Sequence, residues 1–413
     1  MTEVVSWDFN RIVIRDRVTH SHLRRICVAL HQTINDAGFK DVTLDFSMCL
    51  GITEAVMLPV IPLITKYQRN NVDFSFIAPM DQKLHRLFVN ANWAHHLSPS
   101  KCKPSAYEGG QVPALCFGKD GMEDANEIAD RIISLILGQL ETDRSALKAV
   151  EWSLWEIMDN VVRHAQSPVG GFVQATAFKQ SNRVEFVVAD AGIGIAESMR
   201  IAHPDQALRQ AIAEGMTSDR SKNAGNGLYG SYRVALLSKG QFEINSHWGK
   251  LFCDGKDGEV VSTKERAPYA GTSVRCSIDL KDTDLLSNAL EFKGVKHDPP
   301  SDYVERKFEN DQGELTFSLR QEAQRDVGSR HGGIRIRRTI ENLLRTRCPI
   351  AIDFSDIGVI SSSFADEVFG RLFVKMGPRA FMTQIEMHNV DPTVEGLIDR
   401  AIVQRTKLGN GDS

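Results

Sequence analysis

The sequence lacks the marks of several protein classes. Its seven cysteines are scattered and include no CxxC pair, which favours reduced thiols over a disulfide framework or a zinc site. The longest apolar run, AVMLPVIPLI at residues 55–64, is half as long as the roughly 20 residues that span a bilayer, and it contains two prolines. No basic segment followed by an apolar one opens the chain, so no signal peptide is predicted. We therefore expect a cytoplasmic protein with no membrane partner.

A strong excess of one charge is also missing. The net charge is −4, which argues against a general polyanion binder. The stretch SRHGGIRIRR at residues 329–338 has four arginines but no interleaved aromatic residues, so we interpret it as a solvated helix start and expect no nucleic-acid partner. The histidine pairs His20/His22 and His95/His96 lack matching carboxylate or cysteine partners, and we interpret them as structural.

What is present fits a multidomain globular chain. A length of 413 residues predicts about two or three domains. Short β-branched strands at 41–47 and 72–79 flank a helical segment, which predicts a small α/β unit. We expect an α/β domain at 1–97, a linker rich in Pro, Gly and Ser at 98–121, a central domain at 122–282, a polar linker at 283–312 and a C-terminal domain at 313–413.

The first and last domains share a sequence pattern. VTLDFSMCLGITEAVML near the N-terminus parallels IAIDFSDIGVISSSFADEVF near the C-terminus. In both, a strand ends in Asp-Phe-Ser, and an Ile-Thr or Ile-Ser step opens a helix shortly afterwards. Two copies indicate a diverged pair of similar domains rather than a solenoid.

A polar stripe lies on a predicted helix of the central domain. In EWSLWEIMDNVVRHA, residues 151–165, Glu156, Asn160 and His164 are four residues apart and share one helix face. The stripe by itself fits an ordinary amphipathic helix as well as a site. The motifs that follow it favour a site.

Two glycine-containing motifs come next along the chain. VVADAGIGI ends a buried-looking strand with Asp190, followed by Gly192 and Gly194; a carboxylate there can accept a hydrogen bond from an exocyclic amine, and glycines allow close approach of a flat ring. AGNGLYG places Gly225, Gly227 and Gly230 before a helix, where free backbone N–H groups can cradle phosphate.

A final motif, AGTSV, puts Gly271 and Thr272 at the start of a strand. The order E-x-x-x-N, D-x-G-x-G, G-x-G-x-x-G and G-T over roughly residues 122–282 resembles the GHKL ATPase superfamily. That superfamily includes gyrase B, MutL-type repair proteins, sensor histidine kinases and the serine kinases that act as anti-sigma factors, and the resemblance is strongest to the last group. It implies an α/β-sandwich (Bergerat) fold that binds ATP and Mg²⁺.

The resemblance also implies a role for each motif residue. Asn160 would hold Mg²⁺ and Glu156 would act as the general base, while Asp190 would receive the adenine amine. Gly192 and Gly194 would shape the base pocket, which the Thr272 hydroxyl would help to complete. The residues expected to wrap the phosphates are Gly225, Gly227 and Gly230. Arg220 and Lys222, in a segment the size of a nucleotide lid, are either γ-phosphate ligands or solvated loop cations.

The C-terminal stretch IAIDFSDIGVISSSFADEVFGRLF resembles STAS-type domains, the fold of anti-sigma factor antagonists. Ser361, Ser362 and Ser363 stand where those antagonists are phosphorylated, so Ser362 and Ser363 are candidate phospho-acceptors. The simpler interpretation is that one serine caps the helix starting near Phe364. In the N-terminal copy Thr53 occupies the serine position.

Two function classes follow from these motifs. One is a cytoplasmic ATP-binding regulatory protein that hydrolyses ATP or transfers phosphate to Ser or Thr and uses STAS-like domains to recognise a protein partner; a homodimer is compatible with it. The other is a non-catalytic, ATP-dependent interaction switch. A sensor histidine kinase or a gyrase-type clamp is not expected, because the phosphorylatable helical hairpin of the first and the transducer domain of the second have no counterpart.

Overall fold

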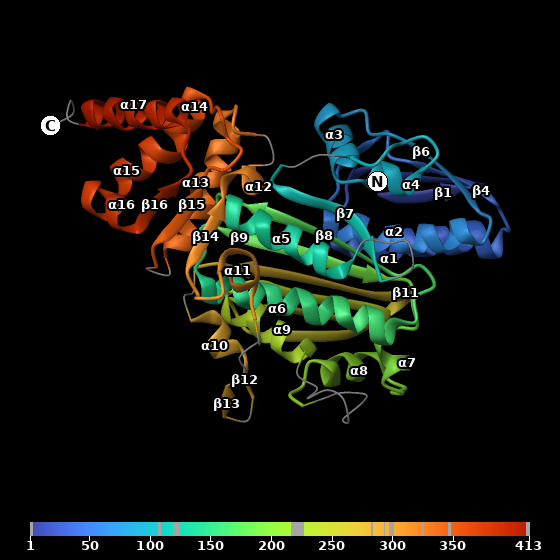
Figure 1. The fold of residues 1–413 in the computed structure, drawn as a ribbon. Coiled ribbons are helices and arrows are strands. Elements are labelled where there is room, and N and C mark those ends of the chain that lie inside the picture. The colour runs from blue at the N-terminus through green and yellow to red at the C-terminus, as the bar shows by residue number, and fades with distance from the viewer. Residues whose placement is uncertain are drawn as a thin grey trace. The chain divides into compact units, whose positions relative to one another are not determined.

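The computed structural model describes residues 3–105, 109–118, 124–215, 227–281, 284–292, 294–296, 301–323, 326–345 and 348–409 (Figure 1). The chain divides into two compact units. Unit 1 comprises Met1–Ile132, Trp152–Asp279 and Leu285–His297, and unit 2 comprises Ile133–Glu151, Leu280–Asp284 and Asp298–Ser413. The division runs through the two helices at the start of the central domain, α5 (Ala125–Gln139) and α6 (Arg144–Asn160).

Unit 1 begins with a four-stranded sheet in the order β1-β2-β4-β6. A hairpin pairs β1 with β2, and β2, β4 and β6 run parallel. The strands are β1 (Val5–Asp8), β2 (Arg11–Ile14), β4 (Asp41–Asp45) and β6 (Asp73–Ile77), with a separate pair β3 (Asp16–Arg17) and β5 (Cys49–Gly51). The helices are η1 (His20–His22), α1 (Leu23–His31), η2 (Gln32–Asp36), α2 (Glu54–Arg69), α3 (Gln82–Asn90) and α4 (Trp93–Leu97).

Helix α2 has the longest buried run among the helices of the N-terminal domain. Every residue from Val56 to Ile64 is buried, including Pro59 and Pro62 inside the helix. A helix that is apolar on all sides must be covered on all sides. One side packs on the N-terminal domain itself, and another packs on β8 (Gly171–Phe178) and β9 (Arg183–Asp190) of the next sheet (Figure 1).

The second sheet of unit 1 has the order β10-β11-β9-β8-β7 and is antiparallel throughout. Its strands are β7 (Gln111–Phe117), β8 (Gly171–Phe178), β9 (Arg183–Asp190), β10 (Gln241–Asp254) and β11 (Val260–Asp279). The other elements of unit 1 are η3 (Val161–Ala165), α7 (Ile195–Ser198), α8 (Pro204–Ala211), α9 (Gly227–Leu237), α10 (Leu285–Ala289), β12 (Glu291–Phe292) and β13 (Val295–Lys296).

The two faces of this five-stranded sheet have different neighbours. Successive residues of a strand point to opposite faces, so Phe186, Val188 and Asp190 share one face and Val187 points to the other. Helix α9 covers the Asp190 face, where its Tyr232 contacts Phe242, and it packs on β10 and β11. The N-terminal domain covers the Val187 face. Asp190 therefore faces the helices and not the N-terminal domain.

Unit 2 contains a three-stranded parallel sheet, β14 (Leu315–Ser318), β15 (Ile350–Asp353) and β16 (Ile385–His388). Its helices are α11 (Tyr303–Phe308), α12 (Leu319–Ala323), α13 (Arg330–Leu344), α14 (Ser362–Ala365), η4 (Asp366–Gly370), α15 (Arg371–Met376), α16 (Pro378–Gln384) and α17 (Pro392–Gly409). Residues 133–151 join this unit through hydrogen bonds: the Asn342 amide donates to the carbonyls of Leu137 and Leu140 (2.9 and 2.8 Å).

The sequence pattern shared by the first and last domains corresponds to a shared topology. β2-β4-β6 and β14-β15-β16 are both parallel, and a helix follows each strand that ends in Asp-Phe-Ser. Asp45 accepts a hydrogen bond from the Ser47 amide at 2.9 Å, and Asp353 accepts one from the Ser355 amide at 3.0 Å. Phe46 and Phe354 likewise each donate a backbone hydrogen bond to the neighbouring strand. The two copies thus share a turn as well as a strand order.

Several local expectations need correction. The β1–β2 hairpin was not anticipated, and residues 111–117, within the stretch expected to be a linker, form β7, because buried Val112, Ala114 and Phe117 outweigh the surrounding Pro and Gly. Residues 283–312 contain α10 and α11. Near the C-terminus, residues 378–384 form α16 after Gly377, and β16 follows it directly. Among the described residues, no helix is long and apolar enough to cross a membrane.

Candidate functional site

The side chain of Asp190 lies at the end of β9 and is 1% exposed. Its Oδ1 accepts hydrogen bonds from the backbone amides of Gly192 (2.7 Å) and Thr272 (3.3 Å). No hydrogen bond from the described residues reaches Oδ2. Burial raises the pKa of Asp190 to about 6, although the two amides and the Lys66 cation act in the opposite direction. The carboxylate is therefore fixed through one oxygen and has the other oxygen available.

The glycines beside Asp190 are required by close backbone approach. A Cβ on Gly192 would lie 1.9 Å from the Ala165 carbonyl oxygen, and one on Gly271 would lie 2.1 Å from the Asp190 carbonyl oxygen. Both distances are far below contact distance. Gly271 also has a φ of 141°, which favours glycine. These two positions let three chain segments converge around the carboxylate.

Ser246 is a site residue that the sequence analysis missed. Its hydroxyl accepts a hydrogen bond from the Ile195 amide (2.8 Å) and lies 3.1 Å from the Thr272 hydroxyl oxygen. Gly194, with a φ of 78°, allows the chain to turn past Ser246 into α7, since a Cβ there would lie 2.9 Å from the Ser246 hydroxyl. Ser246 pairs with Thr272 across β10 and β11, so only the strand register could have identified it.

The polar stripe predicted on α6 lies in unit 1 with the other motifs. Glu156 and Asn160 are half-buried, and Asn160 is the last residue of α6. The chain continues through η3, which contains His164, to Ala165, whose carbonyl accepts a hydrogen bond from the Ile193 amide at 2.9 Å. This bond connects the E-x-x-x-N helix directly to the D-x-G-x-G loop.

Glu156 lies against the start of α9. A Cβ on Gly227 would be 2.1 Å from Glu156 Oε2, so a larger residue at this position would have to displace the Glu156 carboxylate. Burial raises the pKa of Glu156 to about 6, and the Asp159 carboxylate acts in the same direction, against a smaller effect of Arg163. The structure thus brings the predicted general base next to the predicted phosphate loop.

The third predicted phosphate-binding glycine is placed differently. Gly230 is buried one turn into α9, and a Cβ there would lie 2.2 Å from the ring of Trp152 on α6. Its position serves the close packing of the two helices. Gly225, Arg220 and Lys222 lie outside the described residues.

The comparisons with known proteins agree with this geometry. Residues 147–282 match the family model described as histidine kinase-, DNA gyrase B- and HSP90-like ATPase. Residues 147–282 are a GHKL ATPase domain. Members of this family bind ATP, usually with Mg²⁺. Residues 332–395 match a STAS-like domain of unknown function (DUF4325). A search of curated proteins finds no match to the chain.

The STAS-like domain presents its serines at a helix start. Ser361 is the N-cap of α14, and its hydroxyl accepts a hydrogen bond from the Phe364 amide at 3.0 Å. The predicted cap is therefore confirmed. Ser362 is exposed, and Ser363 is half-buried with its hydroxyl oxygen 3.0 Å from that of Ser361.

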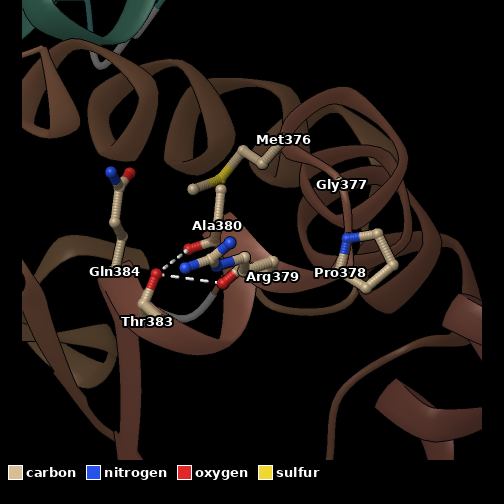
Figure 2. Close-up of a pocket in the computed structure, with 7 residues that line it drawn as sticks. All are labelled: Met376, Gly377, Pro378, Arg379, Ala380, Thr383 and Gln384. Carbon is tan, nitrogen blue, oxygen red and sulfur yellow. Dashed lines mark hydrogen bonds between the residues drawn. The ribbon is translucent and has the colours of Figure 1, made fainter.

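A hollow on the same domain has no connection with these residues. It lies between the end of α15 and α16. Figure 2 shows its seven lining residues, Met376, Gly377, Pro378, Arg379, Ala380, Thr383 and Gln384. The Thr383 hydroxyl is within hydrogen-bond distance of the carbonyl oxygens of Arg379 (2.9 Å) and Ala380 (3.2 Å). None of the predicted site residues lines this hollow.

Proposed function

We propose that the GHKL ATPase domain of this chain binds ATP with Mg²⁺ and that Asp190 reads the adenine base. The observation that carries this proposal is the one-sided fixing of the buried carboxylate. Because Oδ1 accepts two backbone amides, Oδ2 is the acceptor offered to an exocyclic amine. Thr272 and Ser246, joined through their hydroxyls, complete the polar rim beside it.

Asn160 and the start of α9 are proposed to meet the triphosphate. Asn160 ends α6 close to Glu156, and an amide oxygen is a suitable ligand for Mg²⁺. Backbone amides at the start of a helix suit phosphate oxygens, and α9 starts at Gly227. Bound Mg²⁺ would neutralise phosphate charge. Gly230 contributes by allowing α9 to approach Trp152.

Glu156 is the proposed general base. With a pKa of about 6 it is mostly ionised near neutral pH and can accept the proton of an attacking water or hydroxyl. We propose ATP hydrolysis or phosphoryl transfer to Ser or Thr as the reaction, with Ser362 and Ser363 as candidate acceptors. The resemblance to anti-sigma factor serine kinases and the exposure of Ser362 support the transfer.

A regulatory role follows from the flanking domains. We propose that the STAS-like domain at the C-terminus recognises a protein partner, and that the N-terminal domain, which shares its strand order and Asp-Phe-Ser turn, is a second STAS-like domain. Nucleotide binding would then control which partner is engaged. The alternative function is an ATP-dependent interaction switch without turnover.

Incubation with γ-labelled ATP and Mg²⁺ tests these alternatives. Label on the protein that is lost in Ser362→Ala or Ser363→Ala supports a kinase, free phosphate alone supports a hydrolase, and neither product supports the switch. Glu156→Ala should retain nucleotide binding and lose turnover. Calorimetry with a non-hydrolysable ATP analogue and Mg²⁺ tests binding itself, and the absence of any heat of association would refute the whole proposal.

A further inference from the structure

The ATPase sheet shares its hydrophobic core with the N-terminal domain. One continuous core cluster joins Phe88, Trp93 and Ile61 of that domain to Phe172 and Val187 of the sheet. The Trp93 indole also donates a hydrogen bond to Gln174 Oε1 at 2.8 Å. The N-terminal domain therefore covers one face of the ATPase sheet, and the Asp190 side chain lies on the opposite face.

Tyr269 connects the two sides at the position of Asp190. Its side chain is fully buried, and its hydroxyl oxygen is 3.0 Å from the carbonyl oxygen of Pro59 in α2 and 3.0 Å from the carbonyl oxygen of Asp190. A hydroxyl has one proton, so the two carbonyls share a single donor. The position of α2 and the position of the Asp190 backbone are thus set by the same group.

Two cations of the N-terminal domain hold adjacent pocket backbone. Lys66 of α2 donates to the Ala191 carbonyl at 3.2 Å, directly after Asp190. Arg24 of α1 donates to the carbonyls of His247, Gly249 (2.7 Å) and Ala267 (2.9 Å).

The contacts of Arg24 fall where the ladder between β10 and β11 is irregular. The register shifts on both sides of His247, and carbonyls displaced from a ladder need other donors. Ser246, which bonds to the Ile195 amide, immediately precedes this irregularity. Arg24 therefore stabilises the segment that aims Ser246 into the pocket.

We propose that the N-terminal domain, residues 3–97, sets the nucleotide affinity of the ATPase domain, with Tyr269, Lys66 and Arg24 acting as positioning residues. The three side chains do not face the nucleotide. They act on the three backbone segments that present Asp190, Ser246 and Thr272. This inference rests on the proposed nucleotide binding by residues 147–282.

The test measures the affinity of the full-length protein for a non-hydrolysable ATP analogue with Mg²⁺, together with the melting temperature of the nucleotide-free protein. Tyr269→Phe removes only the hydroxyl and should weaken binding about five- to thirtyfold, the range of one buried hydrogen bond. Tyr67→Phe is the matched control. Its hydroxyl also lies on α2 but bonds to Asn35 (3.1 Å), so it should leave the affinity unchanged.

Lys66→Met adds a second measurement, the pH dependence of nucleotide affinity. A purely structural role of Lys66 would not change this pH dependence. Lys66 is the cation that lowers the pKa of Asp190, and the other titratable group packed against that residue is Tyr269. In Lys66→Met the pH at which affinity is half lost should therefore shift upward. Lys40→Met, which removes an exposed cation of the same domain, should not shift it.

The outcomes separate the two proposals. If the wild-type protein binds no analogue, the proposed function fails and this inference fails with it. If the wild type binds but Tyr269→Phe and Lys66→Met match it in affinity and in pH profile, nucleotide binding stands and the positioning role is refuted. Should Tyr269→Phe melt below the assay temperature, Lys66→Met and its control decide the question.

Discussion

The N-terminal and C-terminal α/β domains have the same succession of strands and helices, but the helices that follow their Asp-Phe-Ser turns lie in different surroundings. In the N-terminal domain, α2 is buried from Val56 to Ile64 and packs on the ATPase sheet. In the C-terminal domain, the corresponding helical run has exposed Val374 and an ion pair between Arg371 and Glu367 (3.0 Å). One copy has a helix adapted to cover another domain, and the other retains a helix with a solvent side.

The starts of these helices differ in the same way. Ser361 caps α14 through its hydroxyl, whereas Thr53, at the start of α2, makes no side-chain cap hydrogen bond. The C-terminal copy keeps a serine loop at its surface. In the N-terminal copy, α2 is stabilised by its burial against the ATPase sheet. The same topology therefore occurs with a capped, partly exposed helix in one copy and with a buried, uncapped helix in the other.

The largest expected effect contrasts the two helices directly. Ile61→Asp places a carboxylate in a fully buried position of α2 and should lower the free energy of unfolding by about 4 kcal/mol or more. Val374→Asp, at a position 51% exposed in α15, should change it by about 0.5 kcal/mol or less. Urea denaturation followed by circular dichroism measures both. Equal losses in the two variants would mean that the helices are covered alike.

Tryptophan fluorescence sharpens this experiment. The five tryptophans, at positions 7, 93, 152, 155 and 248, all lie in unit 1. Ile61→Asp should shift the fluorescence transition, while Val374→Asp should leave it in place.

The next largest effect concerns the pocket that the N-terminal copy supports. In Asp190→Asn the amide oxygen must face the two backbone N–H groups that now reach Oδ1, which turns the amide NH₂ toward the adenine amine. Two donors then oppose each other, and affinity for the ATP analogue should fall about 100-fold or more. Calorimetry measures this loss. Asp353→Asn, the matched change at a strand end of the C-terminal copy, should bind like the wild type; a similar loss there would contradict the division of roles.

A smaller effect follows from the raised pKa of Asp190. The proposed adenine recognition needs the ionised carboxylate, so affinity should fall as the pH drops through about 6, by about tenfold between pH 7 and pH 5. Titration calorimetry at several pH values, with saturating Mg²⁺, measures it. Glu156→Gln should keep the same profile if Asp190 is the titrating group.

The stability of the nucleotide-free protein should have the opposite pH dependence. The folded-state pKa values of Asp190 and Glu156, both about 6, lie above their ordinary values. Their contribution to stability is therefore fully present below the ordinary pKa and is lost as the pH rises through about 6. Asp190→Asn should remove part of this dependence in thermal unfolding, and a stability that rises with pH in this window through these groups would contradict the assignment.

The sequence was sufficient for features that depend on local pattern. Glu156 and Asn160 share a helix, and Asp190 ends a strand. The glycines at 192 and 271 stand where backbone approaches closely, the one at 194 has a positive φ beside the side chains of Ser246 and His247, and the one at 227 lies against the Glu156 carboxylate. Ser246 and Tyr269 could not be found in this way, since their roles depend on register and on an irregular ladder. The all-round apolar character of residues 55–64 did contain the signal that α2 is covered on every side.

The smallest effect compares the two helix starts. Ser361→Ala removes the hydrogen bond to the Phe364 amide and should cost about 1 kcal/mol of unfolding free energy. Thr53→Ala removes a hydroxyl that caps nothing and should change stability by only about 0.3 kcal/mol. Circular dichroism follows the first variant and tryptophan fluorescence follows the second. A loss of similar size in Thr53→Ala would show that the start of α2 also depends on a side-chain cap. The two helices would then no longer differ in what stabilises them, a capping hydrogen bond in the C-terminal copy and burial against the ATPase sheet in the N-terminal copy.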